Sequence, residues 1–181
     1  MARASRTELA VLGALSVRPM TGYAVRTAIR DVLGHFWSES YGQIYPTLAQ
    51  LHDDGLVERR AGDRPGSSTY ALTAAGRDRL DSLLRQPDTP APARNGLLLR
   101  LFFGHTVGPA ACRALVEQAR DTARDQLATY QAIRAELAND PEDAAHHPYW
   151  LLTVSAGEHT ARAALAWAEE SLAALDLLDR G

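Results

Sequence analysis

The chain has 181 residues, of which 46% are hydrophobic and 23% are charged, a balance that excludes disordered and collagen-like proteins. Its 19 basic residues, all of them arginine, and its 22 acidic residues give a net charge of −3, which excludes a uniformly basic protein that coats nucleic acid. The single cysteine, Cys112, cannot form a disulfide within one chain, and no signal peptide or membrane-spanning apolar run is recognisable. We therefore expect a cytoplasmic protein without a membrane partner.

A proline-rich stretch near the middle divides the chain into two halves of opposite charge. Residues 1–85 carry 11 arginines and 9 acidic residues, a net charge of +2, whereas residues 86–181 carry 8 arginines and 13 acidic residues, a net charge of −5. This asymmetry is either accidental or a sign that the first half meets a polyanion. The predicted organisation is a domain at 1–86, a linker at 87–92 and a domain at 93–181.

Two helices are predicted at the start of the chain. Thr7 is placed to cap the first, which ends near Pro19, and Thr21 is placed to cap the second, which ends at Gly34. The apolar positions of the second helix recur every three or four residues, as one helical face requires: Val25, Ile29 and Val32.

A third helix is predicted to end at Asp53-Asp54-Gly55. Ser40 and Gln43 fit a capping box, in which the Gln43 side chain reaches back to the backbone N–H of Ser40. Pro46 cannot donate a backbone hydrogen bond, so we expect the regular part of the helix to begin nearer Gln43 than Tyr41. The face expected in the core consists of Ile44, Leu48 and Leu51.

A hairpin and a fourth helix follow. Residues 56–60 and 68–72 are predicted strands on either side of a tip at 62–66 that is dense in turn-forming residues. Thr73 is placed to cap the next helix, and the residues expected to be buried there are Leu80, Leu83 and Leu84. Three short helices followed by a two-stranded wing predict a winged helix-turn-helix, whose third helix enters the major groove of DNA.

The second half is predicted to be helical, which makes the whole protein mostly α. An apolar segment at 97–103 precedes a long helix that Pro109 opens, and a last helix runs from about 148 to 178. Apolar residues of the last helix recur in steps of three and four, with Glu158 as an acidic intrusion. This stripe either packs against the first half or pairs with a second chain, and dimerisation is favoured because a two-fold protein matches two DNA half-sites. The residues predicted at the dimer interface are Leu151, Val154, Leu165, Leu172 and Leu175.

Segments in both halves share the pattern of one known family. The stretch from Phe36 to Leu48 is similar to a recognition-helix signature, most specifically from Tyr41 onward. Thr21-Gly22-Tyr23 is similar to the opening of that family's second helix, and Tyr70 to Gly76 to its passage from wing to helix. The segments 99–104 and 149–158 are similar to the C-terminal helical domain of its larger members. From about residue 7 to residue 176, the chain resembles the PadR family of transcriptional regulators.

The resemblance implies a dimeric repressor that binds a palindromic operator on double-stranded DNA, in the cytoplasm and in association with the nucleoid. The third helix would read bases and the wing would follow the adjacent backbone. The residues expected to meet DNA are Thr21, Tyr23, Ser40, Tyr41, Gln43, Tyr45, Pro46, Thr47, Gln50, Arg64, Ser68 and Tyr70. One departure concerns the wing, because members often carry Lys or Arg just before the tyrosine matched to Tyr70. Ser67-Ser68-Thr69 stand there, which puts a strong contact between wing and phosphate in doubt.

Three features keep two interpretations each. Gln43 either reads adenine through paired hydrogen bonds or only completes the capping box. Arg64 either contacts a groove or a phosphate or is a solvated turn residue. Some members of the resembled family respond to planar aromatic compounds, and four aromatic residues either line a slot for such an effector or act as packing anchors. They are Trp37, Phe102, Phe103 and Trp150.

No catalytic, metal or cofactor site is expected. The sequence contains no Gly-rich phosphate loop, no nucleophile elbow and no convincing pair of carboxylates, so we do not expect an enzyme. His146 and His147 lie beside Asp143, but the histidine spacing is not that of a zinc site. Cys112 lies on the apolar face of the long helix and is expected to be a core residue. The alternative to a DNA-binding regulator is a winged-helix protein-interaction module without specific DNA binding.

Overall fold

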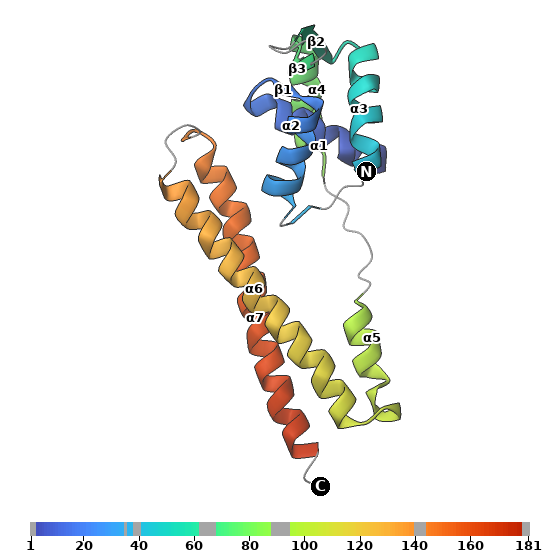
Figure 1. Ribbon diagram of the computed structural model, residues 1–181, viewed down its shortest axis with the longest axis vertical. Coiled ribbons are helices and arrows are strands. Elements are labelled where there is room, and N and C mark those ends of the chain that lie inside the picture. Colours follow the sequence, from blue (N-terminus) through green and yellow to red (C-terminus); the bar gives the residue numbers. More distant parts are fainter. Residues whose placement is uncertain are drawn as a thin grey trace. The chain divides into compact units, whose positions relative to one another are not determined.

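The computed structural model describes residues 3–34, 36–37, 41–61, 68–87, 95–139 and 144–178 (Figure 1). The chain divides into two compact units, Met1–Ala91 and Pro92–Gly181, so the division falls within the proline-rich stretch. Most described residues are helical, and the small antiparallel sheet lies in the first unit. The predicted fold class, a winged helix followed by long helices, is confirmed.

In its described residues, the first unit contains four α-helices, one π-helix and three strands. In chain order they are α1 (Arg3–Val17), β1 (Met20–Thr21), α2 (Gly22–Ala28), η1 (Ile29–Leu33), α3 (Tyr41–Asp53), β2 (Val57–Ala61), β3 (Ser68–Leu72) and α4 (Ala74–Leu84). Their apolar faces enclose one core, in which Leu12, Val25 and Leu83 are almost fully buried. The predicted core face of α3 is confirmed, because Ile44, Leu48 and Leu51 are all buried.

Local capping chemistry fixes several element ends where the sequence predicts them. The Thr21 hydroxyl oxygen accepts from the Ala24 N–H at 3.1 Å at the start of α2. The Thr73 hydroxyl oxygen accepts from the Gly76 N–H at 3.0 Å at the start of α4. Gly55, with φ of +71°, ends α3 in a conformation that suits glycine, and the Leu56 N–H returns to the Leu51 carbonyl at 2.9 Å.

Other predictions for the first unit are wrong in detail. Thr7 does not cap α1 but is buried inside it, since the helix already begins at Arg3. The α3 helix is regular from Tyr41 onward although Pro46 lies within it, so the missing N–H of one proline does not delay its start. The second predicted helix changes to a π-helix at Ile29. Leu84, predicted to be buried in the fourth helix, is 65% exposed.

The sheet has three strands, in the order β1-β3-β2, and not two. In the predicted hairpin Val57 lies opposite Leu72 and Arg59 lies opposite Tyr70. The additional strand β1 pairs antiparallel with β3, with Met20 opposite Tyr70. Two residues beside Pro19 give no strand pattern in the sequence, and only pairing with a distant segment makes them one.

The second unit begins with a short helix and continues as a long helical hairpin. Its elements are α5 (Gly96–Phe102), the 3-10 helix η2 (Gly104–Thr106), α6 (Pro109–Asn139) and α7 (His147–Leu178). Asn95 caps α5, because its side-chain oxygen accepts from the N–H groups of Leu97 and Leu98 at 3.0 and 3.1 Å. Figure 1 shows α6 and α7 side by side, as their extensive packing requires.

The apolar stripe of the last helix, predicted to pack against the first half or to pair with a second chain, instead packs on α6. The predicted stripe of α7 includes Val154, Ala161 and Ala168, which are buried on the face that packs on α6. Glu158 is buried in the same face, where its carboxylate accepts from Arg134 Nε at 2.7 Å and from an Arg162 terminal nitrogen at 3.0 Å. The stripe therefore has a partner within its own chain, the neighbouring helix α6.

Candidate DNA-binding surface

The α3 helix separates a buried apolar face from an exposed polar one. Gln43, Pro46 and Gln50 are exposed, and Thr47 is half-buried beside them. Gln43 and Gln50 carry side-chain amides and Thr47 carries a hydroxyl, which can exchange hydrogen bonds with base edges in the major groove, whereas Pro46 offers only apolar surface. These four predicted DNA contacts therefore lie on one accessible surface.

The two ends of α3 differ in charge. Gln50 donates from its side-chain amide to the Asp54 carboxylate at 3.0 Å, and Asp53 and Asp54 are both exposed. Carboxylates repel the phosphate backbone, whereas the start of a helix carries partial positive charge. The half of α3 that contains Gln43 and Thr47 is therefore the better suited to approach DNA.

Two predicted tyrosine contacts lie where α2 begins. Tyr23 is 66% exposed and Tyr45 is 48% exposed. A Cβ atom at Gly22 would lie 3.0 Å from the Tyr45 ring, so this glycine lets α2 and α3 approach closely. Thr21, also predicted to meet DNA, uses its hydroxyl oxygen to cap α2.

The wing contains two neighbouring arginines in different settings. Arg59 donates from Nε to the Ser68 hydroxyl at 2.7 Å, whereas Arg60 forms an ion pair with Glu58. Strand register places Arg59, Ser68 and Tyr70 on one face of the hairpin, and Arg60 on the other. Among the residues that the structure describes, Arg59 has no carboxylate partner. The sequence does not determine which of the two arginines faces a given surface, because that depends on the strand register.

Most other arginines of this unit with a described partner bind carboxylates. Arg79 binds Glu8 through two contacts of 2.7 and 2.9 Å, and Arg85 binds Asp81 at 2.7 Å. The hydrogen bond from Arg85 holds the pKa of the Asp81 carboxyl below its usual value. These pairs neutralise basic charge on α4. Arg59 on the wing differs, because it has no carboxylate partner among the described residues.

Three residues predicted to contact DNA lie wholly or partly outside the residues that the structure describes. Ser40 and Arg64 lie outside the described residues, and so does Ser67 of the wing. Tyr41 is the first residue of α3, but its side chain is not described. The capping box at Ser40 and the wing-tip contact of Arg64 therefore stay predictions.

The predicted aromatic residues belong to both units. Trp37 is half-buried in the first unit, whereas the other three belong to the second. Phe102 and Phe103 meet edge to face, with ring centroids 5.1 Å apart. Trp150 stacks on His146 at 5.5 Å and meets His147 at 5.7 Å. Cys112 is buried, as predicted.

Within the described ranges, no group of three or more His, Cys, Asp or Glu side chains is placed to hold a metal ion. The predicted neighbour of the histidine pair, Asp143, lies outside those ranges. No helix among them is long and apolar enough to cross a bilayer.

Comparison with known proteins accounts for both units. Residues 11–82 match the family described as "Transcriptional regulator PadR-like family", and residues 93–176 match "Virulence activator alpha C-term". The chain is 31% identical over 137 residues to the negative transcriptional regulator PadR of Bacillus subtilis, covering 74% of this chain and 71% of that protein.

Two solved structures resemble the whole chain. The crystal structure of Bacillus subtilis PadR with operator DNA has a TM-score of 0.78 and 25% identity over 93% of this chain and 98% of its own. The structure of the Vibrio cholerae virulence activator AphA has a TM-score of 0.71 and 27% identity over 94% and 98%. The chain belongs to the PadR-like family, whose members are DNA-binding transcriptional regulators and not enzymes.

Proposed function

We propose that this regulator is a repressor that binds a palindromic operator as a homodimer in the cytoplasm, and that a small aromatic acid releases it. The observation that carries the proposal is the division of α3, with Ile44 and Leu48 in the core and the uncharged residues Gln43, exposed, and Thr47, half-buried, on another side of the helix. Arg59 on the wing supplies a cation for the neighbouring backbone.

Electrophoretic mobility shifts with the DNA upstream of the protein's own gene test the proposal. We expect that DNA to bind at least about a thousandfold more tightly than random DNA at the same salt concentration. Equal affinity for the two DNAs at every salt concentration would overturn the proposal and favour a protein-interaction module.

Thr47→Ala tests the reading face of α3. It should weaken operator binding by about 1–3 kcal/mol and leave binding to random DNA nearly unchanged, because a base contact is lost. Thr129→Ala removes the same hydroxyl from an exposed position of α6, so both affinities should stay at wild-type values. An unchanged operator affinity in Thr47→Ala would show that Thr47 does not touch a base edge.

The proposed effector site surrounds Trp150. His147, which meets the Trp150 ring, has a buried Nε2 atom without a hydrogen-bond partner among the described residues. Such a nitrogen can bind a carboxylate while the indole stacks on an aromatic ring. The crystal structure of Bacillus subtilis PadR with p-coumaric acid supports this class of ligand. Titrating p-coumaric acid should release the operator from wild-type protein but not from His147→Ala, and retention by both would contradict the proposed effector.

A further inference from the structure

The side chain of Arg59 is anchored at one nitrogen of its guanidinium group. Nε donates to the Ser68 hydroxyl oxygen at 2.7 Å. Neither terminal nitrogen has a hydrogen-bond or carboxylate partner among the residues that the structure describes, and Arg59 is exposed. A guanidinium held through Nε keeps its two terminal nitrogens in one plane, where they can donate together to two oxygens of a phosphate.

Strand register explains why this hydrogen bond forms. Arg59 lies opposite Tyr70 and Ala61 lies opposite Ser68, so Ser68 is the diagonal neighbour of Arg59 on the same face. Diagonal neighbours are within reach of a side chain as long as arginine. Ala61 ends β2 and Ser68 begins β3, so the Arg59 side chain extends toward the end of the hairpin where residues 62–67 join the strands. The hydrogen bond therefore holds the charge at the tip end of the wing.

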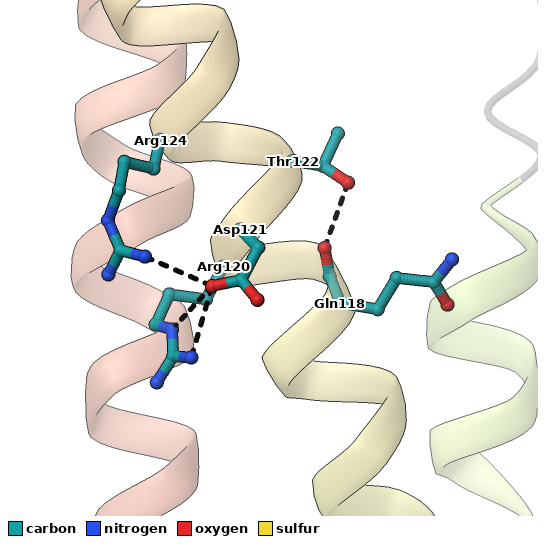
Figure 2. A network of polar contacts seen from close by, with 5 residues as sticks. All are labelled: Gln118, Arg120, Asp121, Thr122 and Arg124. Carbon is teal, nitrogen blue, oxygen red and sulfur yellow. Dashed lines mark hydrogen bonds and ion pairs between the residues drawn. The ribbon is translucent and has the colours of Figure 1, made fainter.

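Elsewhere in the chain, arginine Nε atoms donate to carboxylates. They do so in Arg30, Arg79, Arg85, Arg120 and Arg134. Figure 2 shows such a network on α6, where the Asp121 carboxylate accepts from Arg120 Nε and from Arg124 at 3.1 Å each. A carboxylate orients a guanidinium but also offsets its charge, whereas a serine hydroxyl orients it and leaves the charge in place.

We infer that Ser68 is a positioning residue for DNA binding, which holds the Arg59 guanidinium in the orientation that meets a phosphate and does not touch DNA itself. The inference rests on the backbone contact of Arg59 in the proposed function and adds the group that prepares this contact. An unrestrained arginine loses rotamer freedom when it binds, and a side chain already held in one orientation loses less. A phosphate contact carries no base information, so Ser68 should contribute equally to the binding of operator and random DNA.

Substitutions of Ser68 test the role of its hydroxyl, with affinities measured by fluorescence anisotropy. Ser68→Ala should weaken binding to operator and random DNA alike by about three- to tenfold, because Arg59 is then ordered only on binding. Ser68→Thr keeps a hydroxyl in a residue type that suits a strand, and its affinities should equal those of wild type. The matched control, Thr69→Val, removes a hydroxyl from the opposite face of the same strand and should leave both affinities unchanged. Circular dichroism and thermal melting establish that all the variants fold.

A double variant separates positioning from direct contact. Because Ser68 acts through Arg59, Ser68→Ala should have no further effect on affinity in the Arg59→Gln background. A Ser68 hydroxyl that touches phosphate itself would instead lower affinity by the same factor in both backgrounds, and that result would overturn the inference. Wild-type affinity of folded Ser68→Ala would also overturn it, as would an equal loss in Ser68→Thr or in Thr69→Val.

Ser68→Asp tests why the acceptor is neutral. A carboxylate should still orient Arg59 but offset its charge, so the slope of log affinity against log salt concentration should become shallower by at least about one. An unchanged slope would mean that the Arg59 charge does not reach a phosphate, and the inference would be wrong. The same titrations compare operator with random DNA. A Ser68 without effect leaves sequence-specific binding standing, whereas equal affinity of the wild-type protein for the two DNAs overturns the proposed function and not the role of Ser68.

Discussion

At the scale of single residues, the surroundings of an arginine decide whether its charge is available to DNA. Arg60 follows Arg59 in the chain, but successive side chains of a strand point to opposite faces. On the other face, Arg60 forms an ion pair with Glu58. Arg59 donates instead to the neutral hydroxyl of Ser68 on the other strand. Arg59 thus offers the charge that Ser67-Ser68-Thr69 lack.

We therefore expect Arg59→Gln to weaken binding to all DNA sequences alike. The slope of log affinity against log salt concentration should become shallower by about one, since one phosphate contact releases about one counterion. Arg60→Gln is the matched control and should change the slope much less. Titrations at four or more salt concentrations measure both. A shallower slope for Arg60→Gln with an unchanged slope for Arg59→Gln would reverse the assignment.

Glu158 links the stability of the helical hairpin to pH. The hydrogen bond from Arg134, and then that from Arg162, holds the pKa of the Glu158 carboxyl below its ordinary value of 4.5. A carboxyl whose pKa is lowered by folding contributes stability above its ordinary pKa, and this contribution is lost as the pH falls through the lowered pKa.

Glu158→Gln should therefore lower the melting temperature at pH 7, because it leaves Arg134 and Arg162 without their shared carboxylate. The difference between wild type and variant should shrink as the pH falls below about 4. Thermal melts followed by circular dichroism from pH 7 to pH 3 measure this difference. A constant difference over that range would mean that the Glu158 charge does not stabilise the fold.

At the scale of elements, two helical glycines have opposite roles. A Cβ atom at Gly76 of α4 would lie 2.0 Å from the Leu56 carbonyl oxygen, so this glycine allows α4 to approach the turn after α3. A Cβ atom at Gly13 of α1 would meet no atom of a neighbouring element within 4 Å, so no contact requires a glycine there.

Gly76→Ala should destabilise the first unit by about 1–3 kcal/mol, because backbone must move to admit the methyl group. Gly13→Ala should stabilise it by about 0.5–1 kcal/mol, since alanine loses less entropy in a helix. Urea unfolding of the two variants beside wild type measures both signs. A destabilising Gly13→Ala or a neutral Gly76→Ala would contradict this account of the two helices.

Sequence predicts elements well where short-range chemistry fixes them. Thr21 and Thr73 as caps, Gly55 as a helix end and Pro109 as a helix start depend on residues within a few positions. The strand β1, the setting of Arg59 and the cover of Val154 by α6 depend on segments far apart in the chain. A stripe of apolar residues shows that a helix is covered on that side, but not which helix covers it.

At the scale of the whole molecule, charge and function divide between the same two units. Residues 1–85 carry a net charge of +2, and residues 86–181 carry a net charge of −5. DNA, a polyanion, is therefore attracted to the part that contains α3 and the wing. The long helices α6 and α7 lie in the other part. A dimer joined through the second unit would present two copies of α3 to one DNA duplex.

This arrangement predicts that operator spacing matters. Half-sites of a two-fold protein lie one helical turn apart, about 10–10.5 base pairs, so that both copies of α3 enter the same face of DNA. Inserting five base pairs between the half-sites turns one of them to the opposite face, and affinity should fall to about that of a single half-site. Inserting ten base pairs returns both half-sites to the same face of the DNA. The protein should bind this operator more tightly than the one with the five-base-pair insertion. Fluorescence anisotropy with the three operators measures these affinities at one salt concentration. Equal affinity for all three would mean that each reading unit binds its half-site independently, and the palindrome would then reflect two separate sites.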